Sequence, residues 1–412
     1  MSYDEATFRR KPDQPTETDP AAYRRRVQYD DTAAGTLDQS LRAPVHTTGS
    51  IPVVVEDDGR DRLGVHLGWE VLLLLAAGAI GFLLFSFDAD ALRRPDLDAL
   101  LVSGAAIGLL TLGAGLSLRA GVPNLAIGPV ALAAAFQYAE NSDRGLIPAI
   151  APALVIAAAG GLLVAIFVLA LHVPGWATTL AAGLGVIVYS QLRVAPVAVQ
   201  GDWAPTDQAF LLFGGFALLA LLGGGLGAIG PVRRWVGGFR PAGDPSRRPG
   251  PAAAVAVVLA LVLSSVFAAG AGILLAANAS GPVQPGTGLE WTGIGIGLAL
   301  LGGTSAYGRR GGIFGTLFAV TAMALFLDYE NRRELDIAIF AVAASVFAAG
   351  LIVTRLVETY GRPLPAGTGE EWNAAASNGT WSPAMPETWN SPGAAPAARG
   401  ERWDEGPWSA NR

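Results

Sequence analysis

Long apolar runs alternate with short polar stretches over most of this chain, and each apolar run has the length of a helix. Several reach about 20 residues, the length that crosses a hydrocarbon core about 30 Å thick. The runs do not alternate with the two-residue period of a membrane β-strand, so the pattern predicts an all-α, polytopic membrane protein. The ten segments are 68–87, 98–118, 122–139, 146–171, 176–196, 208–229, 252–278, 290–307, 312–329 and 335–357.

Three of these segments, the third, the fifth and the eighth, are short or interrupted by Gly and Pro. Segments of this kind often form broken or re-entrant helices that line a transport path. The pattern therefore predicts about ten transmembrane or half-spanning helices, in a single membrane domain over residues 67–358.

The two ends of the chain lack such segments. Residues 1–66 are polar and rich in Asp, Arg, Thr and Pro, and residues 359–412 are rich in Pro, Gly and Ala. Both are expected to be disordered tails, because they hold too little apolar sequence to form a core. The start of the chain also lacks the apolar core of a cleavable signal peptide. Five of the 10 tryptophans lie in the second tail, which is solvated, contains a short recognition segment, or lies at the lipid interface.

Composition agrees with the membrane class and excludes several chemistries. The 412 residues are 51% hydrophobic and 15% charged, against roughly 25% charged in soluble proteins. The absence of Cys excludes disulfides and thiolate metal sites. Lys11 is the only lysine and lies in a stretch without Gly, so the chain lacks a Walker A loop and is not expected to hydrolyse ATP. No catalytic residue, metal, bound cofactor or nucleic-acid partner is predicted.

The placement of arginines predicts the orientation in the membrane. With the N-terminus inside, the basic loop 230–251 is cytoplasmic, whereas the opposite loops 197–207 and 279–289 hold no basic residue. Two loops that this orientation places outside nevertheless hold arginines, Arg93–Arg94 in one and Arg332–Arg333 in the other. Acidic residues flank each pair. The balance places both termini in the cytoplasm.

The run Leu300–Val320 packs six glycines and the adjacent Arg309 and Arg310 between two apolar segments. An arginine at bilayer depth costs about 2.5–3.5 kcal/mol or more, so this pair predicts a sharp turn at a membrane face. Small residues there let two helices approach closely. The motif residues are Gly302, Gly303, Thr304, Ser305, Gly308, Arg309 and Gly311.

Three motifs occur in the order found in the sugar-type permease subunits of bacterial ABC importers. GVPNLAIGPVALAAA at Gly121–Ala135, VPGWATTL at Val173–Leu180, and the glycine-arginine run resemble that family's three signature segments. The resemblance covers roughly residues 68–357 and neither tail.

The resemblance implies a multi-pass subunit of the bacterial cytoplasmic membrane, paired with a second permease chain as a homo- or heterodimer within the lipid bilayer. Two ATPase subunits would dock on the cytoplasmic side and use the ATP that drives alternating access. A solute-binding protein would deliver a monosaccharide or a related small polar solute, nucleosides included.

Two polar residues of the first two motifs are candidates for the substrate path. The Asn124 amide can donate and accept hydrogen bonds, which suits a hydroxyl-rich solute, but it also suits a cap for a helix broken beside Pro123. Thr179 either faces the substrate or bonds the backbone of its own helix.

Further candidates lie nearer the helix ends. Trp176 suits either stacking against a sugar or anchoring at the interface, and Gln137 with Tyr138 suits an entry gate near the outer end. Arg193 falls in an otherwise apolar run and is expected to extend to the interface.

The long cytoplasmic loop departs from the family pattern. Family members carry a coupling helix there, but Gly237–Pro251 contains four prolines that disfavour a regular helix. Two alternatives therefore stay open: a permease-like scaffold or regulator that has lost ATPase coupling, and a secondary carrier. The membrane-segment acidic residues fall at segment ends, which weighs against the carrier. The residues assigned to coupling are Arg233, Arg234, Arg240 and Asp244.

Overall fold

A computed structural model describes residues 63–229, 232, 250–305 and 312–360 of this protein. The predictions for the tails beyond these residues, and for the cytoplasmic loop, lie outside the described part. Within that part the regular structure is helical, apart from an isolated bridge between Val197 and Val283.

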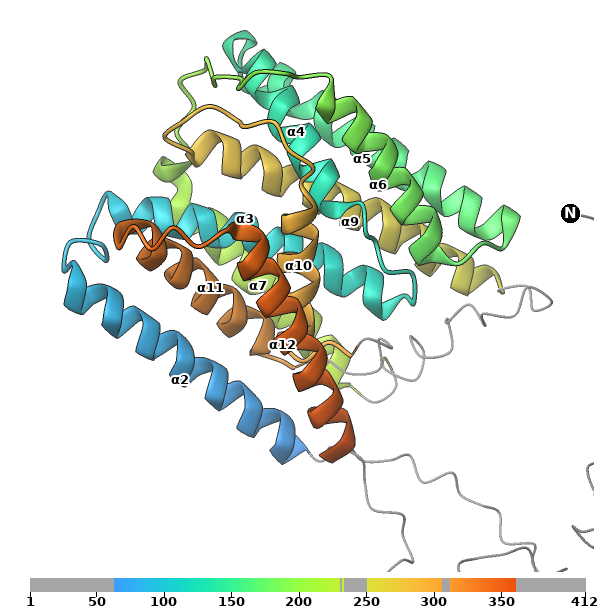
Figure 1. Ribbon diagram of the computed structural model, residues 1–412. Coiled ribbons are helices and arrows are strands. Elements are labelled where there is room, and N and C mark those ends of the chain that lie inside the picture. The colour runs from blue at the N-terminus through green and yellow to red at the C-terminus, as the bar shows by residue number, and fades with distance from the viewer. Residues whose placement is uncertain (1–62, 230–231, 233–249, 306–311, 361–412) are drawn as a thin grey trace, which may run out of the picture. The chain divides into compact units, whose positions relative to one another are not determined.

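The α-helices are α2 (Leu63–Phe87), α3 (Asp96–Arg119), α4 (Ile127–Asn141), α5 (Leu146–Leu171), α6 (Gly175–Gln191), α7 (Ala209–Ala228), α9 (Pro251–Asn278), α10 (Leu289–Leu301), α11 (Gly315–Arg332) and α12 (Ile339–Tyr360) (Figure 1). Two short 3-10 helices are η1 (Ser142–Arg144) and η2 (Pro205–Gln208).

Six helices are long and apolar enough to cross a membrane: α2, α3, α5, α7 with η2, α9 and α12. This indicates a membrane-embedded protein and confirms the predicted all-α class. The helices α4, α6 and α10 have only 15, 17 and 13 residues, so the third, fifth and eighth segments are indeed short.

Several helices begin or end a few residues away from the approximate segment bounds. α2 begins at Leu63, four residues inside the predicted tail, and α12 begins at Ile339 and continues to Tyr360. α6 ends at Gln191 rather than at residue 196. These differences arise because hydropathy marks the residues that leave water, whereas the helix ends where its backbone hydrogen bonds end.

The eighth segment ends earlier than predicted, at Leu301 instead of residue 307. Gly303 adopts a left-handed φ of 95°, the Thr304 N–H donates to Ala299 O (2.9 Å), and the Gly303 N–H donates to Leu300 O (2.9 Å). This pair of bonds is a Schellman motif, which stops an α-helix and satisfies its last carbonyls.

The same device ends α3. Gly121 has a φ of 72°, the Val122 N–H donates to Ser117 O (3.0 Å), and the Gly121 N–H donates to Leu118 O (3.0 Å). The sequences before the two ends share the pattern G-x-G-L-x-L-x-x-G, at 113–121 and 295–303. Of the helices that follow, α4 ends with F-x-x-x-E-N, and α11 has the same pattern one residue before its end. The pair α3–α4 is therefore repeated as α10–α11, a relation that hydropathy alone does not reveal.

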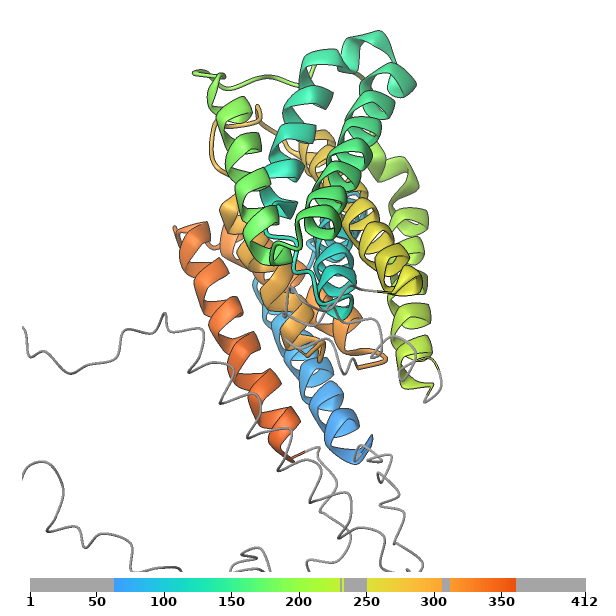
Figure 2. The same ribbon diagram turned by 90° about the vertical axis from the view of Figure 1, so that its right-hand side faces the viewer.

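α9 lies at the centre of the packing and contacts α3, α4 and α5, while α2 packs on α11 and α10 on α12. Figures 1 and 2 show α2 and α12 on one side of the bundle and α5 and α6 on the other. The outer helices expose large apolar side chains in the way expected of a lipid-facing surface. More than half exposed are Leu75, Phe82, Ile147, Ile156 and Leu211.

Close crossings in this bundle depend on glycine. A Cβ at Gly272 of α9 would overlap the carbonyl oxygen of Ala131 in α4, and one at Gly161 of α5 would crowd the Leu261 carbonyl in α9. Helices in membranes associate largely through such close backbone packing. The first contact holds α4 against α9 and the second holds α5 against α9, which positions the site described next.

Candidate functional site

The chain between α3 and α4 is unwound at the depth of the middle of α9. The Asn124 amide donates to Ser264 Oγ (2.7 Å) and to Ser265 Oγ (3.3 Å), and these serines sit halfway along the 28-residue α9. Asn124 is only 2% exposed. Correcting the prediction, α4 begins at Ile127 and not at 122, because Pro123 cannot donate the backbone bond that a continuous helix needs.

Hydroxyl groups from other helices satisfy the polar backbone of this unwound segment. Thr179 Oγ1, on α6, donates to Pro123 O (2.8 Å) and accepts from the Leu125 N–H (3.2 Å). Thr292 Oγ1, on α10, donates to Leu125 O (3.2 Å) and accepts from the Gly128 N–H (3.0 Å).

Two further hydrogen bonds involve the backbone of this segment. The Asn124 N–H donates to Ser117 Oγ (3.1 Å), and Asn124 Oδ1 accepts from the Ala126 N–H (3.1 Å). Unpaired backbone groups cost several kcal/mol each inside a membrane, so these bonds are what permits a broken helix here.

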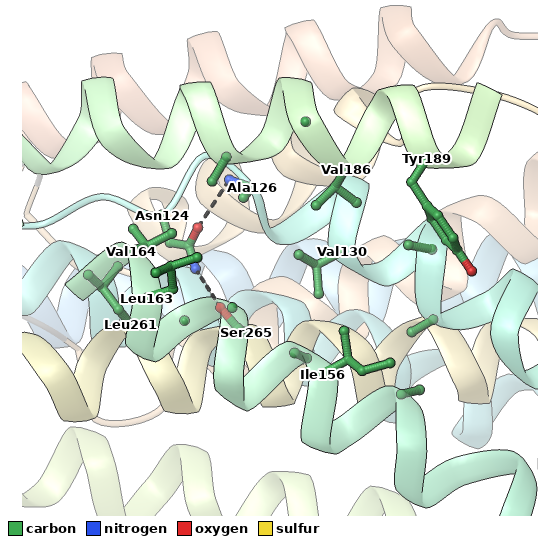
Figure 3. A pocket seen from close by; sticks show the side chains of 18 of the residues that line it. Asn124, Ala126, Val130, Ile156, Leu163, Val164, Val186, Tyr189, Leu261 and Ser265 are labelled. Atoms are coloured by element: carbon green, nitrogen blue, oxygen red, sulfur yellow. Dashed lines mark hydrogen bonds between the residues drawn. The ribbon is translucent and has the colours of Figure 1, made fainter. Parts of the chain in front are cut away.

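A cavity of about 410 Å³ lies beside this segment, between α4, α5, α6 and α9. Most of its lining is small or aliphatic. Asn124 and Ser265 are at one end, and Tyr189 lies at the other (Figure 3). Gln137, from the last turns of α4, also contributes to the wall.

An ion pair connects α4 to the end of α6 beside Tyr189. The Arg193 guanidinium donates to both carboxylate oxygens of Glu140 (2.8 and 2.9 Å), to Tyr189 O (2.9 Å) and to Tyr189 Oη (2.7 Å). Its carbon lies 4.1 Å from the centre of the Tyr189 ring and 5.3 Å from that of Phe136. The hydrogen bond to Glu140 raises the pKa of Arg193 against the opposing effect of burial, so the arginine stays charged.

Replacing Arg193 by Ala should make the cavity more accessible from water. The change removes the two charge-assisted hydrogen bonds to Glu140 and frees the Tyr189 ring; for a partly exposed pair we expect a loss of about 1.4 kcal/mol, between the roughly 0–1 of an exposed pair and the roughly 3–5 of a buried one. The measurement is the labelling rate of a Gln137→Cys variant with a water-soluble maleimide, free of background because the chain has no Cys. We expect an increase of about tenfold, since about 1.4 kcal/mol corresponds to tenfold in an equilibrium.

The matched control is Arg144→Ala, which removes an exposed arginine from the same end of the bundle. Equal labelling rates in the two variants would show that Arg193 does not hold this part of α6 against α4.

The comparisons with known proteins identify no relative: no protein-family model, no curated protein and no solved structure matches this chain. Its function is therefore inferred from its own residues.

The structure brings two of the four predicted path residues to the cavity. Asn124 and Gln137 line it. Thr179 is 1% exposed and supports the unwound segment from behind. Trp176 is 55% exposed and lies outside the cavity lining, at the start of α6.

The described part of the glycine-arginine motif is a close crossing between the end of α10 and the start of α11. A side chain at Gly302 or Gly315 would collide with the backbone of the other helix. Thr304 and Ser305 follow and are buried. The remaining motif residues Gly308, Arg309 and Gly311, and the coupling residues Arg233, Arg234, Arg240 and Asp244, lie outside the described residues.

Two residues at the start of α2 support this crossing. Trp69 Nε1 donates to Leu301 O (2.7 Å). The Glu70 carboxylate accepts from the N–H groups of Phe314 (3.1 Å) and Gly315 (3.3 Å) at the beginning of α11. Glu70 is 4% exposed, so this acidic residue serves as a helix cap, where a carboxylate is favoured.

Sequence reasoning missed the residues that hold the broken helix. Ser264 and Ser265 interrupt an otherwise apolar run, LVLSSVF, and that interruption is a usable signal. Thr292 and the partnership of Arg193 with Glu140 leave no comparable trace, because their partners lie 167 and 53 residues away along the chain.

Proposed function

We propose that this chain is the membrane-spanning permease subunit of an ABC importer for a monosaccharide or a related small polar solute. One observation carries the proposal: a broken helix presents Asn124 at mid-depth to a cavity between α4, α5, α6 and α9. Discontinuous helices and internally repeated elements are typical of transport proteins, whose substrate sites lie near the membrane midplane. Both features occur here, since α3–α4 is repeated as α10–α11.

The dimensions of the cavity suit a small solute in passage. Its volume of about 410 Å³ lies within the roughly 300–1,000 Å³ of small-molecule sites. The wall offers few polar groups between its two ends. A transport path must bind its solute weakly enough to release it, and a lining of this kind meets that requirement.

The proposal includes the partners that the family resemblance implies. Two ATPase subunits dock on the cytoplasmic side, a second permease chain completes the path, and a solute-binding protein delivers the solute from outside. The proposed cytoplasmic side is the one that holds the α10–α11 crossing and the start of α2.

A second candidate, a permease-like scaffold or regulator without ATPase coupling, is favoured by one feature of the site. The Asn124 amide is already hydrogen-bonded within the protein at both its nitrogen and its oxygen. An amide so engaged is a structural cap in this conformation, and a solute would have to replace one of these bonds.

Gentle purification of the tagged full-length chain from its native membrane distinguishes the candidates. The importer predicts that an ABC ATPase copurifies in a comparable amount and that the complex, in proteoliposomes, takes up a labelled monosaccharide only with ATP. An intact, folded chain without any ATPase would contradict the importer and favour the scaffold. Uptake by the chain alone, driven by a proton or sodium gradient, would establish a secondary carrier.

A further inference from the structure

Arg119, the last residue of α3, has no carboxylate partner among the residues that the structure describes. Within those residues three arginines are partly buried: Arg119, Arg193 and Arg332. Arg193 pairs with Glu140, and Arg332 pairs with three aspartates. Charges that leave water are normally paired in this way, because their desolvation is costly. Arg119 is the exception, and its charge is available to a ligand.

The guanidinium of Arg119 lies against the last turns of α7. Its Nη1 donates to Gly223 O (3.0 Å), which is the hydrogen bond that the described residues supply to this side chain. A guanidinium carries five N–H donors, so most of them remain for a ligand. A Cβ at Gly223 or Gly227 would lie 3.8 or 3.9 Å from the same nitrogen, so the lack of side chains there keeps the charge uncovered. Because Arg119 is only partly buried, a ligand can reach it from outside the bundle.

The surface beside this guanidinium is apolar. Leu222, Leu226 and Ile229, along the same turns of α7 and at its end, are each about half exposed. They lie at the end of a helix that is long and apolar enough to cross a membrane, so they face lipid near the membrane edge. On the other side of α7, a Cβ at Gly224 would collide with the carbonyl oxygen of Ile313, just before α11. The end of α7 is therefore held in place next to the charge.

These neighbours determine the class of ligand. It must carry a negative charge, offer several acceptors and lie at the membrane edge. Phosphate oxygens match the forked donors of an arginine, which can bind two of them at once. Basic sites between membrane helices on the cytoplasmic side bind anionic lipid headgroups. The exposed apolar side chains beside Arg119 would contact the acyl chains of such a lipid, which a free phosphate ion lacks.

We propose that Arg119 and the glycine face of α7 bind the phosphate of an anionic phospholipid from the cytoplasmic leaflet. The guanidinium supplies charge and hydrogen bonds, and Gly223 and Gly227 leave room for the headgroup. The site goes beyond the proposed function, because it uses the proposed orientation in the membrane but neither a transported solute nor an ATPase. The lipid would join α7 to the end of α3, from which the chain continues into the unwound segment at Asn124.

Native mass spectrometry of the delipidated full-length chain tests the site. The probes are phosphatidylglycerol and phosphatidylcholine with the same acyl chains. We expect the parent to bind phosphatidylglycerol about tenfold more tightly, which corresponds to about 1.4 kcal/mol, and Arg119→Ala to lose this preference. Gly227→Leu keeps the arginine but fills the space beside it, so it should also reduce the preference. The matched control is Arg355→Ala, which removes an exposed arginine of α12 on the same proposed side and should leave the preference unchanged.

Inorganic phosphate separates a lipid site from a site for the free ion. We expect millimolar phosphate not to displace phosphatidylglycerol, and displacement would contradict a lipid site. Equal affinities for the two lipids in the parent, or a preference that persists in Arg119→Ala, would overturn the proposal. So would an equal loss in Arg355→Ala, which would indicate a diffuse effect of basic residues. Circular dichroism shows whether each variant is folded; if Arg119→Ala is not, an unchanged preference in Gly227→Leu overturns the proposal by itself.

Discussion

Replacing Gly272 by Ala should strongly destabilise the protein, whereas the same change at Gly270, on the same helix, should not. A methyl group at position 272 would overlap the Ala131 carbonyl, which is backbone and cannot rotate away. At position 270 a methyl group would lie 3.5 Å from the end of the Leu109 side chain, an ordinary contact. Forcing extra atoms into a packed core costs about 1–3 kcal/mol and occasionally more.

The expected result is a large drop in the thermal unfolding midpoint of Gly272→Ala, or a failure to purify as a monodisperse species. Gly270→Ala should unfold at the same temperature as the parent or above it, because Ala stabilises a helix interior by roughly 0.5–1 kcal/mol relative to Gly. Both proteins are compared in the same detergent by light scattering during heating. Equal midpoints for the two variants would mean that α4 and α9 do not cross this closely.

Replacing Arg332 by Ala should destabilise the end of the bundle at which α2 finishes and α3 begins. Arg332 binds Asp88 (2.6 Å), Asp96 (2.8 Å) and Asp328 (2.8 Å), and so ties the α2–α3 connection and the start of α3 to the end of α11. Without the arginine, three carboxylates remain close together with their counter-ion gone. The Arg332 side chain is 21% exposed. We therefore expect a loss of about 2 kcal/mol, between the roughly 0–1 of an exposed pair and the roughly 3–5 of a buried one.

The dependence on salt separates this cause from general damage. Dissolved ions screen charges that reach the solvent, so salt weakens the ion pairs in the parent and weakens the repulsion among the three carboxylates in Arg332→Ala. The stability difference between the two proteins should therefore shrink as the ionic strength rises from about 0.01 M to about 1 M. Arg93→Ala is the control, since its pair with Asp90 is 72% and 76% exposed and should contribute little. A deficit that does not change with salt would contradict the electrostatic explanation.

The same contacts account for three of the four arginines that depart from the predicted arginine distribution. Arg332 is surrounded by three carboxylates, Arg93 pairs with Asp90, and Arg94 lies 3.5 Å from Asp98. Hydropathy and charge counts treat these arginines as free cations. Each of these three arginines keeps its positive charge, but neighbouring carboxylates compensate it.

The sequence predicted the helices correctly but did not predict the tertiary contacts between them. All ten apolar segments correspond to helices, and the three short ones were recognised by their Gly and Pro residues. Hydropathy depends only on residues that are close together along the chain, so it predicts helices without knowledge of the tertiary structure. It did not reveal where α4 begins or where α10 ends, because those points depend on Pro123 and on the left-handed Gly303.

The candidate site shows the same division. Asn124 was predicted from its amide and its place in the first motif, and Gln137 from its position near the end of its segment; both line the central cavity. Trp176 was predicted from its place in the second motif but lies outside that lining. The packing of a short helix, and not its sequence alone, decides which of its faces points into the protein. For α6 that face is defined by Thr179 and Gly183, which contact the unwound segment.

The sequence by itself determined that this is a helical membrane protein with broken helices at particular places, since the transfer of apolar side chains from water and the backbone limits of Pro and Gly are local properties. Only the tertiary structure decided how a broken helix survives at that depth. Asn124 meets Ser264 across 140 residues, and Leu125 meets Thr179 and Thr292 across 54 and 167. Such partners are found by packing, because each exposed peptide group must find a hydrogen bond where no water is present.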